Sequence, residues 1–551
     1  MEKKIREKLF SEWLRDERKK LISSRINTKE FSSPKRGYIH FDKRRKNPSF
    51  SEIKNSISNP AVISQIGFWP FIKDIIPTPR YKKKKHKDGS EFREIDLKKR
   101  EVFYAAHKDA LIYSWYAFLL TRGYYEQYLK DKKIERNVLS YRKIPIEEGK
   151  NKNKCNIHFA EEVFRFVRDK GKCATFVSDI SSFFDTLDHE HLKKEWCRLL
   201  GVEGSRLPVD HYTIYRNLTE FKYVDLKSIN KALNVEYLRS TSKISRKKKN
   251  GKFTYETKIY QESFRNGIKI NSFLDFRNGI NPREEFFKKI ACSNLIKSNN
   301  RTNKIAGSPR AGKLCGIMQG APISAVLSNI YMMSFDEEIS HLMNKYDGIY
   351  RRYSDDIFIA CNIDDLNQIK TIIQKTIKKY ELTINDNKTD VTFFLQEKRG
   401  LRGFADIYGT IYKKAQYLGF EFDGQRSYIR GSSVSNYYRK MKRNVGKAVN
   451  MAYSKQSKSK KDNNRVFKKR LCKRFLYQGR RSFISYALRA SSIMNSQSIR
   501  RQLLGRFEIF RKALDYRIQK KEQKIRRYEY ARSSRISRSS NIRDATVAKQ
   551  Q

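Results

Sequence analysis

The chain has 551 residues, of which 38% are hydrophobic and 13% aromatic, enough for buried cores in about two to four domains. Its 119 Lys and Arg outnumber its 59 Asp and Glu, and the net charge of +60 would repel itself unless a polyanion neutralised it. These values exclude a disordered tail or a fibre, and they favour a nucleic acid as the partner.

The N-terminus and the cysteines argue against a secreted protein, a disulfide framework and a zinc ribbon. The first ten residues, MEKKIREKLF, are charged where a secretory signal needs an apolar segment, and no stretch approaches the roughly 18 apolar residues of a membrane span. We therefore expect a cytoplasmic protein with no membrane partner. The seven cysteines are widely spaced and include no C-x-x-C pair, so they indicate neither a disulfide framework nor a zinc ribbon.

Basic residues are concentrated in the last quarter of the chain. Residues 425–551 hold 36 Lys and Arg against 6 Asp and Glu, so we expect this part to contact nucleic acid most extensively. Two shorter basic runs, 82–87 and 246–249, lie beside Gly or Asn and are typical of exposed loops. The Ser/Lys stretch 454–461 and the Ser/Arg stretch 532–540 predict flexible linkers or tails.

The first distinctive element is a short apolar run, CATFVS at 173–178, which predicts a buried strand that ends at Asp179. A helix should follow, with Asp188 as its N-cap. Its apolar residues recur at helical spacing and should share one face: Leu192, Trp196, Leu199 and Leu200.

A second helix and a hairpin are expected further along. Pro322 suits the first turn of a helix that should extend into the 340s. Its apolar face should comprise Ile323, Val326, Leu327, Ile330 and Tyr331. The runs 348–353 and 357–361 are strand-like and are separated by SDD at 354–356, so they predict a hairpin with two acids at its tip. The order strand, helix, helix, hairpin indicates an α+β fold.

The carboxylates of Asp179, Asp355 and Asp356 are difficult to explain by structure alone. Brought together at strand ends they would repel one another in a low dielectric, so they need cations. Mg²⁺ prefers oxygen ligands, and two ions about 3.5–4 Å apart can activate an attacking hydroxyl and stabilise a leaving phosphate oxygen. The sequence therefore predicts the chemistry of a polymerase. By contrast, Asp364 and Asp365 precede a polar helical stretch and should lie on the surface.

These motifs, in this order, resemble those of the reverse transcriptases. That family carries an acid after a strand, a QG-x-P-x-S turn, a Y-x-D-D hairpin, a lysine-bearing motif and a primer-grip hairpin. The matching segments here are SDISSFFDTLDH (178–189), MQGAPISAVLSNIYM (318–332), YSDD (353–356), LTINDNKT (382–389) and YLGFEF (417–422). The resemblance covers roughly 93–424 and implies a right-hand polymerase with fingers, palm and thumb.

The resemblance also implies a role for each matching residue in catalysis. Asp179, Asp355 and Asp356 would bind two Mg²⁺ ions, with the backbone carbonyl of Ile180 near one of them. Lys388 would be a general acid for the departing pyrophosphate, although a lysine among Asn and Asp is equally an ordinary surface residue.

Other matching residues would contact the substrates. Phe184 would exclude a 2′-hydroxyl and so favour deoxyribonucleotides, the alternative being that it is a core residue. Gln319 and Gly320 would line the incoming nucleotide, and Tyr353 would support the primer end. Arg93, in a segment like the family's fingers, would bind the triphosphate, because a guanidinium can bind phosphate through two hydrogen bonds.

Within the family, the resemblance is to the bacterial defence-associated and abortive-infection enzymes. It is carried by VLSYRK (138–143), NIHFAEEVFRFV (156–167) and YRNLTEFKYV (215–224). The 140 positions from Asp179 to Gln319 are also a long separation. A group II intron protein would commonly end in a module that bears Cys and His, whereas neither follows Cys472, and a retron enzyme would usually be shorter.

We therefore expect a basic N-terminal extension (1–60), fingers (61–170), a palm (171–424) with an inserted helical and basic segment at about 200–315, and a basic helical thumb with tail (425–551). The expected function is RNA-directed DNA synthesis from deoxynucleoside triphosphates in antiphage defence, with a bound noncoding RNA as template and DNA as product. An untemplated or homopolymer-making polymerase, a retroelement enzyme and a non-catalytic RNA-binding scaffold remain as alternatives. Assembly as a homo-oligomer stays open.

A polymerase of this kind needs a hydroxyl group to start from, and the C-terminal tail offers candidates. Tyr528 and Tyr530 lie among arginines in KIRRYEYARSSRISRSS (524–540), and a phenolic oxygen can attack an activated nucleotide as a 3′-hydroxyl does. Some abortive-infection relatives attach DNA to themselves. The two tyrosines are therefore candidate protein primers, the alternative being that they pack or stack on bases.

Overall fold

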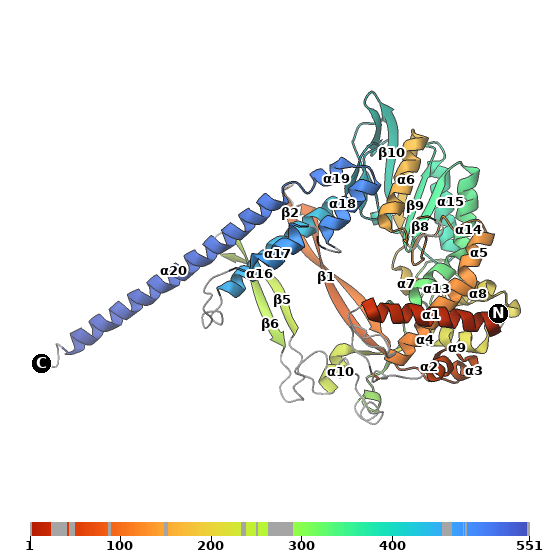
Figure 1. The fold of residues 1–551 in the computed structure, drawn as a ribbon, viewed down its shortest axis with the longest axis horizontal. Helices are drawn as coiled ribbons and strands as arrows, with labels where there is room; N and C mark the ends of the chain where they lie inside the picture. The colour runs from red at the N-terminus through yellow and green to blue at the C-terminus, as the bar shows by residue number, and fades with distance from the viewer. Residues whose placement is uncertain are drawn as a thin grey trace.

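The computed structural model (Figure 1) describes residues 3–23, 41–42, 50–85, 90–147, 152–232, 239–249, 252–262, 290–453, 466–477, 479 and 482–547. Helices and sheets are mixed along the chain, so the predicted α+β class is confirmed. The expected boundaries of fingers, palm and thumb stay a prediction.

The central sheet has the strand order β11-β10-β3-β9-β8. Its strands are β3 (Cys173–Asp179), β8 (Ile349–Tyr353), β9 (Asp356–Cys361), β10 (Asp390–Glu397) and β11 (Gly400–Phe404). Because β3 pairs antiparallel with both β9 and β10, the strand that ends at Asp179 lies in the middle of the sheet. The predicted buried strand and the predicted hairpin are both confirmed.

Side chains of this sheet alternate between two hydrophobic cores, as the two-residue period of a strand requires. Phe176, Ile357 and Ile359 belong to a first core. Helices that contribute buried residues to that core include α8 (His189–Leu200), α13 (Ser324–Tyr331), α14 (Met333–Lys345) and α15 (Leu366–Lys379). Phe358 and Ala360 belong to a second core with α6 (Asn156–Lys170) and the C-terminal helices. Helices therefore cover both faces of the sheet.

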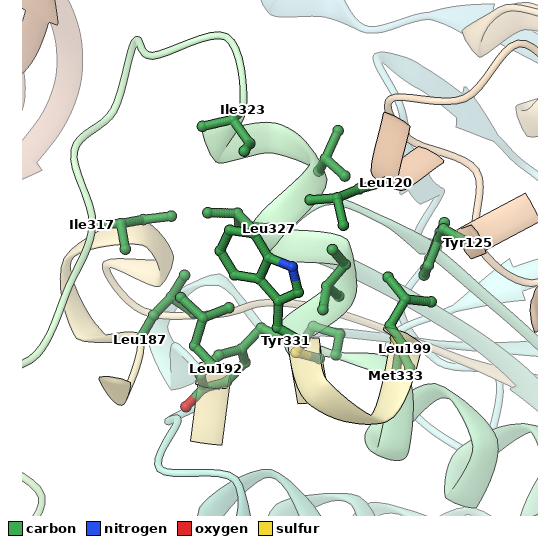
Figure 2. Close-up of a cluster of buried hydrophobic side chains, with 14 of the residues drawn as sticks. Leu120, Tyr125, Leu187, Leu192, Leu199, Ile317, Ile323, Leu327, Tyr331 and Met333 are labelled. Carbon is green, nitrogen blue, oxygen red and sulfur yellow. The ribbon is translucent and has the colours of Figure 1, made fainter. Parts of the chain in front are cut away.

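The helix expectations for α8 and α13 are largely confirmed. Asp188 is the N-cap of α8 and accepts a hydrogen bond from the His191 N–H at 2.8 Å. The single helix expected after Pro322 is divided at Met332 into α13 and α14. Figure 2 labels the side chains through which α8 and α13 meet, Leu192, Leu199, Leu327 and Tyr331.

The N-terminal part builds a second sheet, of order β2-β1-β4-β7, around a long hairpin. Its strands are β1 (Phe71–Lys85), β2 (Glu91–Tyr104), β4 (Lys222–Asp225) and β7 (Lys297–Ser298). Helices of this region are α1 (Lys3–Ser23), α2 (Phe50–Ser58), α3 (Pro60–Ser64), α4 (His107–Leu120), η1 (Thr121–Tyr125), α5 (Glu126–Asp131), η2 (Glu203–Ser205), α9 (Val209–Thr219) and α10 (Leu226–Ala232). Trp13 of α1 is buried with its ring centroid 5.9 Å from that of Trp115, so α1 is part of the first core.

The described parts of both short basic runs are strands and not the loops that were expected, and residues 86–87 lie outside the described residues. Residues 82–85 continue β1, and residues 246–249 end β5 (Arg239–Lys249), which pairs with β6 (Lys252–Glu262). The inserted segment, expected to be helical, therefore contains a hairpin as well as helices. Backbone pairing across a long antiparallel ribbon does not depend on apolar side chains, which explains why the charge pattern alone suggested loops.

The C-terminal part is helical, with α16 (Gly431–Ala452), α17 (Lys468–Phe475), α18 (Phe483–Ile493), α19 (Gln497–Arg501) and α20 (Arg506–Val547). The start of α20 packs on α16, and the Tyr453 hydroxyl donates to Glu522 at 2.9 Å. Beyond that contact α20 runs away from the rest of the molecule (Figure 1). The predicted tail at 532–540 is therefore helical, whereas the predicted linker at 454–461 lies outside the described residues.

Two further features concern the cysteines and the length of the apolar helices. All seven cysteines are free, in agreement with the absence of a disulfide framework. In the part of the chain that the structure describes, no helix combines the length and the apolar character needed to cross a bilayer.

Candidate active site

Two strand ends bring the predicted acids together. In the antiparallel pair of β3 and β9, Asp179 lies directly opposite Asp356, and Asp355 precedes Asp356 in the β8–β9 turn. Opposite residues in such a pair have Cβ atoms about 4.5–5.5 Å apart. The Ile180 N–H also donates to the Asp355 carbonyl at 3.0 Å, which ties the turn to the end of β3. The acids of the two motifs, 177 positions apart in the sequence, are thus neighbours.

Burial and mutual repulsion both act on these carboxylates. Burial raises the pKa of Asp356 to about 7, and the charges of Asp355 and Asp179 add to the rise. Burial also raises the pKa of Asp355, again together with Asp179. Lys388, in η4 (Asp386–Lys388), forms an ion pair with Asp179. The negative charges of the three acids are therefore only partly balanced, and Lys388 supplies one of the positive charges beside them.

The turn that carries Asp355 is held by groups that sequence reasoning missed. Ser354 is buried and has a positive φ of 61°, which few non-glycine residues adopt. Its N–H donates to the Ser140 hydroxyl at 2.8 Å, and its carbonyl accepts from Arg352 at 3.1 Å. Because these bonds fix the peptide groups before and after Ser354, they hold the strained residue and the orientation of Asp355.

Arg352 itself is fully buried, and its guanidinium group donates several hydrogen bonds. Its guanidinium makes two hydrogen bonds with the carboxylate of Asp336 in α14, at 2.7 and 2.6 Å, and it donates to Asn329 at 3.1 Å. The Tyr350 hydroxyl also donates to Asp336, at 2.6 Å. Arg352 adjoins the Y-x-D-D motif in sequence, but nothing in the sequence indicates that Asp336 is its partner.

A pocket of about 960 Å³ opens beside the acids. Asp179, Asp356 and Lys388 line one side of it, and the turn between β12 (Ala415–Tyr417) and β13 (Phe420–Phe422) lines another. With β14 (Ser427–Ile429), these two strands form a separate three-stranded sheet. Arg430, which follows β14, also lines the pocket and lowers the pKa of Asp356 by its charge, against the dominant effect of burial.

Comparison with known families finds a match that includes part of this site. The family model described as "Reverse transcriptase (RNA-dependent DNA polymerase)" matches residues 213–422. Residues 213–422 are therefore similar to the reverse transcriptase family. The matched range includes the hairpin acids, Lys388 and the β12–β13 turn but begins after Asp179, which the strand register joins to it. The right-hand fold expected from the motifs accords with this family.

Parts of the chain are also similar to named proteins. The retron Ec83 reverse transcriptase of Escherichia coli is 31% identical over 126 residues, which are 21% of this chain and 40% of that protein. Apo telomerase of Candida tropicalis, truncated from its C-terminal domain, aligns at 10% identity with a TM-score of 0.33, over 65% of this chain and 56% of the other. Candida albicans telomerase with a telomeric RNA fragment aligns at 12% identity with a TM-score of 0.30, over 82% and 66%. The chain thus spans less than two thirds of each relative's length.

The residues expected to contact the nucleotide lie on or beside the N-terminal hairpin of β1 and β2. The Phe103 N–H donates to the Gln319 carbonyl at 2.9 Å, so the QG turn is attached to β2. Gly320 has a φ of +122°, and a Cβ there would lie 2.7 Å from the Phe103 carbonyl oxygen, which requires glycine. The Gln319 side chain is exposed. Arg93 lies in β2 opposite Lys83. The structure describes the backbone of Arg93 but not its side chain.

Phe184 and Tyr353 are both partly buried. Phe184 lies in the short helix α7 (Phe183–Thr186) and is partly buried against the first core, so part of its ring is accessible. Its carbonyl accepts from the Ile317 N–H at 2.8 Å, which links α7 to the segment before the QG turn. Tyr353 lines the pocket, and burial raises its pKa. The roles expected for both residues stay predictions.

The proposed primer tyrosines are not brought to this site. Tyr528 and Tyr530 are 69% and 77% exposed on the part of α20 beyond its contact with α16. That part of the helix extends away from the central sheet (Figure 1). Asp364 and Asp365, expected to be surface residues, are at the opposite end of β9 from Asp356 and take no part in the site.

Proposed function

We propose that this protein is an RNA-directed DNA polymerase that extends a 3′-hydroxyl with deoxynucleoside triphosphates. The observation that carries the proposal is the register of Asp179 opposite Asp356, with Asp355 beside them, at the wall of a pocket that also contains the β12–β13 turn. Burial first, and then the charges of the neighbouring acids, raise the pKa values of Asp355 and Asp356, and shifts of this kind cluster at functional sites.

We further propose that Asp179, Asp355 and Asp356 hold two Mg²⁺ ions, with the Ile180 carbonyl near one of them. Among the described residues no three His, Cys, Asp or Glu side chains make a metal-binding group by themselves. Mg²⁺ usually binds through one or two carboxylates together with substrate phosphates, so we propose that the phosphates of the nucleotide complete the coordination. When bound, the ions would supply an activated hydroxyl and a stabilised leaving oxygen.

The chain's own residues supply positioning and a proton in this proposal. Lys388 Nζ, now paired with Asp179, would be released as cations bind the acids and would donate its proton to the departing pyrophosphate. The accessible part of the Phe184 ring would exclude a 2′-hydroxyl. Gln319 and Gly320 would line the nucleotide, Arg93 would bind its phosphates, and Tyr353 would support the primer end.

The partner that fits the charge of +60 is a stably bound RNA, and we propose a noncoding RNA that serves as template in bacterial antiphage defence. A second candidate, a retron-type enzyme, is favoured by the similarity to the Escherichia coli retron reverse transcriptase. A non-catalytic scaffold is disfavoured because it would have no need for mutually repelling acids.

Sequencing separates these candidates. The protein is purified with its bound nucleic acid, supplied with deoxynucleotides, and the RNA and any new DNA are both sequenced. DNA complementary to a copurified RNA supports the proposal, and linkage of that RNA to the DNA would favour the retron type. A homopolymer that matches no RNA would instead support untemplated synthesis, and no DNA at all would contradict the proposed function.

A further inference from the structure

Apolar side chains are exposed on one loop beside the pocket. Residues 405–412, hereafter the apolar loop, make up most of the connection between β11 and β12. Four of their side chains are largely open to solvent: Ile407 (49%), Tyr408 (83%), Ile411 (63%) and Tyr412 (64%). Large apolar side chains gathered in one exposed place usually mark a binding surface.

The apolar loop is held in this form by one carboxylate. Asp406 accepts hydrogen bonds from the N–H groups of Tyr408, Thr410 and Ile411 at 3.0, 3.1 and 3.1 Å, and from the Thr410 hydroxyl at 2.8 Å. The ends of the loop are joined by the Ala405 N–H, which donates to the Ile411 carbonyl at 2.8 Å. Because polar bonds fix the backbone, the exposed side chains are not needed to fold the loop.

Strand register places the apolar loop at the same edge of the sheet as the acids. Phe404 at the end of β11 is opposite Phe393, so the chain beyond it runs towards Asp390, which is opposite Val177 near the end of β3. Lys413, just after the loop, bonds to Asp390 at 2.6 Å. Tyr412 lines the pocket that holds Asp179 and Asp356.

Cationic groups accompany the exposed rings. Arg402 lies 5.4 Å from the centre of the Tyr412 ring, and Lys414 lies 3.7 Å from that of Tyr428. Arg402, Lys414 and Arg426 also line an adjoining pocket of about 340 Å³ that shares Tyr412 with the larger one. The neighbouring acid Glu397 is already paired with Arg402. Positive charge next to exposed aromatic rings is the combination that binds single-stranded nucleic acid.

We propose that the apolar loop is a stacking platform for an unpaired nucleic acid strand beside the catalytic pocket. Tyr408 and Tyr412 would stack on bases while Lys414, Arg402 and Arg426 attract the phosphates. This proposal rests on the proposed function, because that function makes the neighbouring pocket a catalytic site. A protein partner is less well matched, since the platform is continuous with the pocket that holds the acids.

The test measures binding, which does not require catalysis. Fluorescence anisotropy of labelled oligodeoxythymidylate is followed over a range of salt concentrations for the parent, Tyr408→Ala and Tyr408→Phe. We expect Tyr408→Ala to weaken binding about tenfold, because one stacked base is lost, with an unchanged slope against salt, because no phosphate contact is lost. Tyr408→Phe should bind as the parent does.

Two controls make the result specific. Tyr212→Ala removes a partly exposed ring from α9, outside the site, and should leave affinity unchanged. A blunt duplex should bind to Tyr408→Ala as to the parent. Parental affinity of Tyr408→Ala for the single strand would overturn the proposal, and a changed oligomeric state alongside it would assign the loop to a protein contact. If Tyr408→Ala weakens binding as expected but the parent makes no DNA, the proposed function alone would be overturned.

Discussion

Arg352 and Asp336 form an ion pair at 2.6 Å in which neither side chain is exposed to solvent. Through its bond to the Ser354 carbonyl, the same guanidinium supports the turn that presents Asp355. A pair of this kind connects the geometry of the acids to the packing of α14 against the sheet.

Replacing Arg352 by Met should destabilise the protein by about 3–5 kcal/mol, because Asp336 is left charged and unpaired in the core. Thermal melting measures the loss. The double variant Arg352→Met/Asp336→Leu should recover much of it, because no buried charge remains. Arg352→Lys keeps the charge but not the paired bonds, and we expect it to lower kcat with KM little changed; a change in KM alone would argue against a positioning role.

Asp109 should make stability depend on pH. It is buried, accepts a hydrogen bond from the Trp69 N–H at 2.9 Å, and burial raises its pKa from 3.8 to about 8. The folded state therefore favours the neutral acid, so its stability is fully present below about pH 4 and is lost as pH rises towards 8. Melting temperatures between pH 5 and 8.5 should fall more steeply for the parent than for Asp109→Asn. Equal slopes would contradict this assignment.

Phe184 should control the choice of sugar. If its ring excludes a 2′-hydroxyl, Phe184→Ala should bring the kcat/KM values for ribo- and deoxyribonucleotides closer together. Phe183→Leu is the matched control, because Phe183 is buried in the core and its change should lower the melting temperature without altering the ratio. Unchanged discrimination in Phe184→Ala would make Phe184 a core residue.

The part of α20 beyond Glu522 should add RNA affinity without adding stability. A chain that ends at Gln523 keeps the Tyr453–Glu522 contact and loses eight Lys and Arg against two Asp and Glu. We expect an unchanged melting temperature, weaker RNA binding and a shallower dependence of affinity on salt. Truncation at Gly424 is a poorer test, because α16 and α18 help to form the second core. Unchanged affinity and slope would remove this helix from the RNA-binding surface.

Much of the central sheet was predictable from local pattern. The apolar run before Asp179, the capping residue Asp188 and the alternation around SDD at 354–356 each depend on neighbours in sequence, and the structure contains the expected strand, helix and hairpin. The likeness of the five ordered motifs to one family supplied the rest of the candidate site. Which acids lie opposite each other followed only from the register of β3 and β9.

What the sequence did not reveal depends on contacts between distant segments. Nothing near Trp13 indicates that its ring packs near Trp115, and nothing near Arg352 indicates Asp336 as its partner. The basic run at 82–87 was expected to be a loop because of its charge and the neighbouring Gly, yet its residues 82–85 pair along β2. The apolar loop was missed for a similar reason, since exposure is a tertiary property.

The central claim is that Asp179, Asp355 and Asp356 form the catalytic centre of a DNA polymerase. Its most direct test is Mg²⁺-dependent incorporation of deoxynucleotides on a primed RNA template by the variant Asp355→Asn/Asp356→Asn. The surface variant Asp364→Asn/Asp365→Asn is the matched control, because it removes the same charges from an adjacent pair of acids outside the site. The account predicts that synthesis is abolished in the first variant and retained in the second, with RNA binding intact in both and no loss of melting temperature in the first, since repulsion is relieved. Primer extension by Asp355→Asn/Asp356→Asn near the parental rate would contradict it.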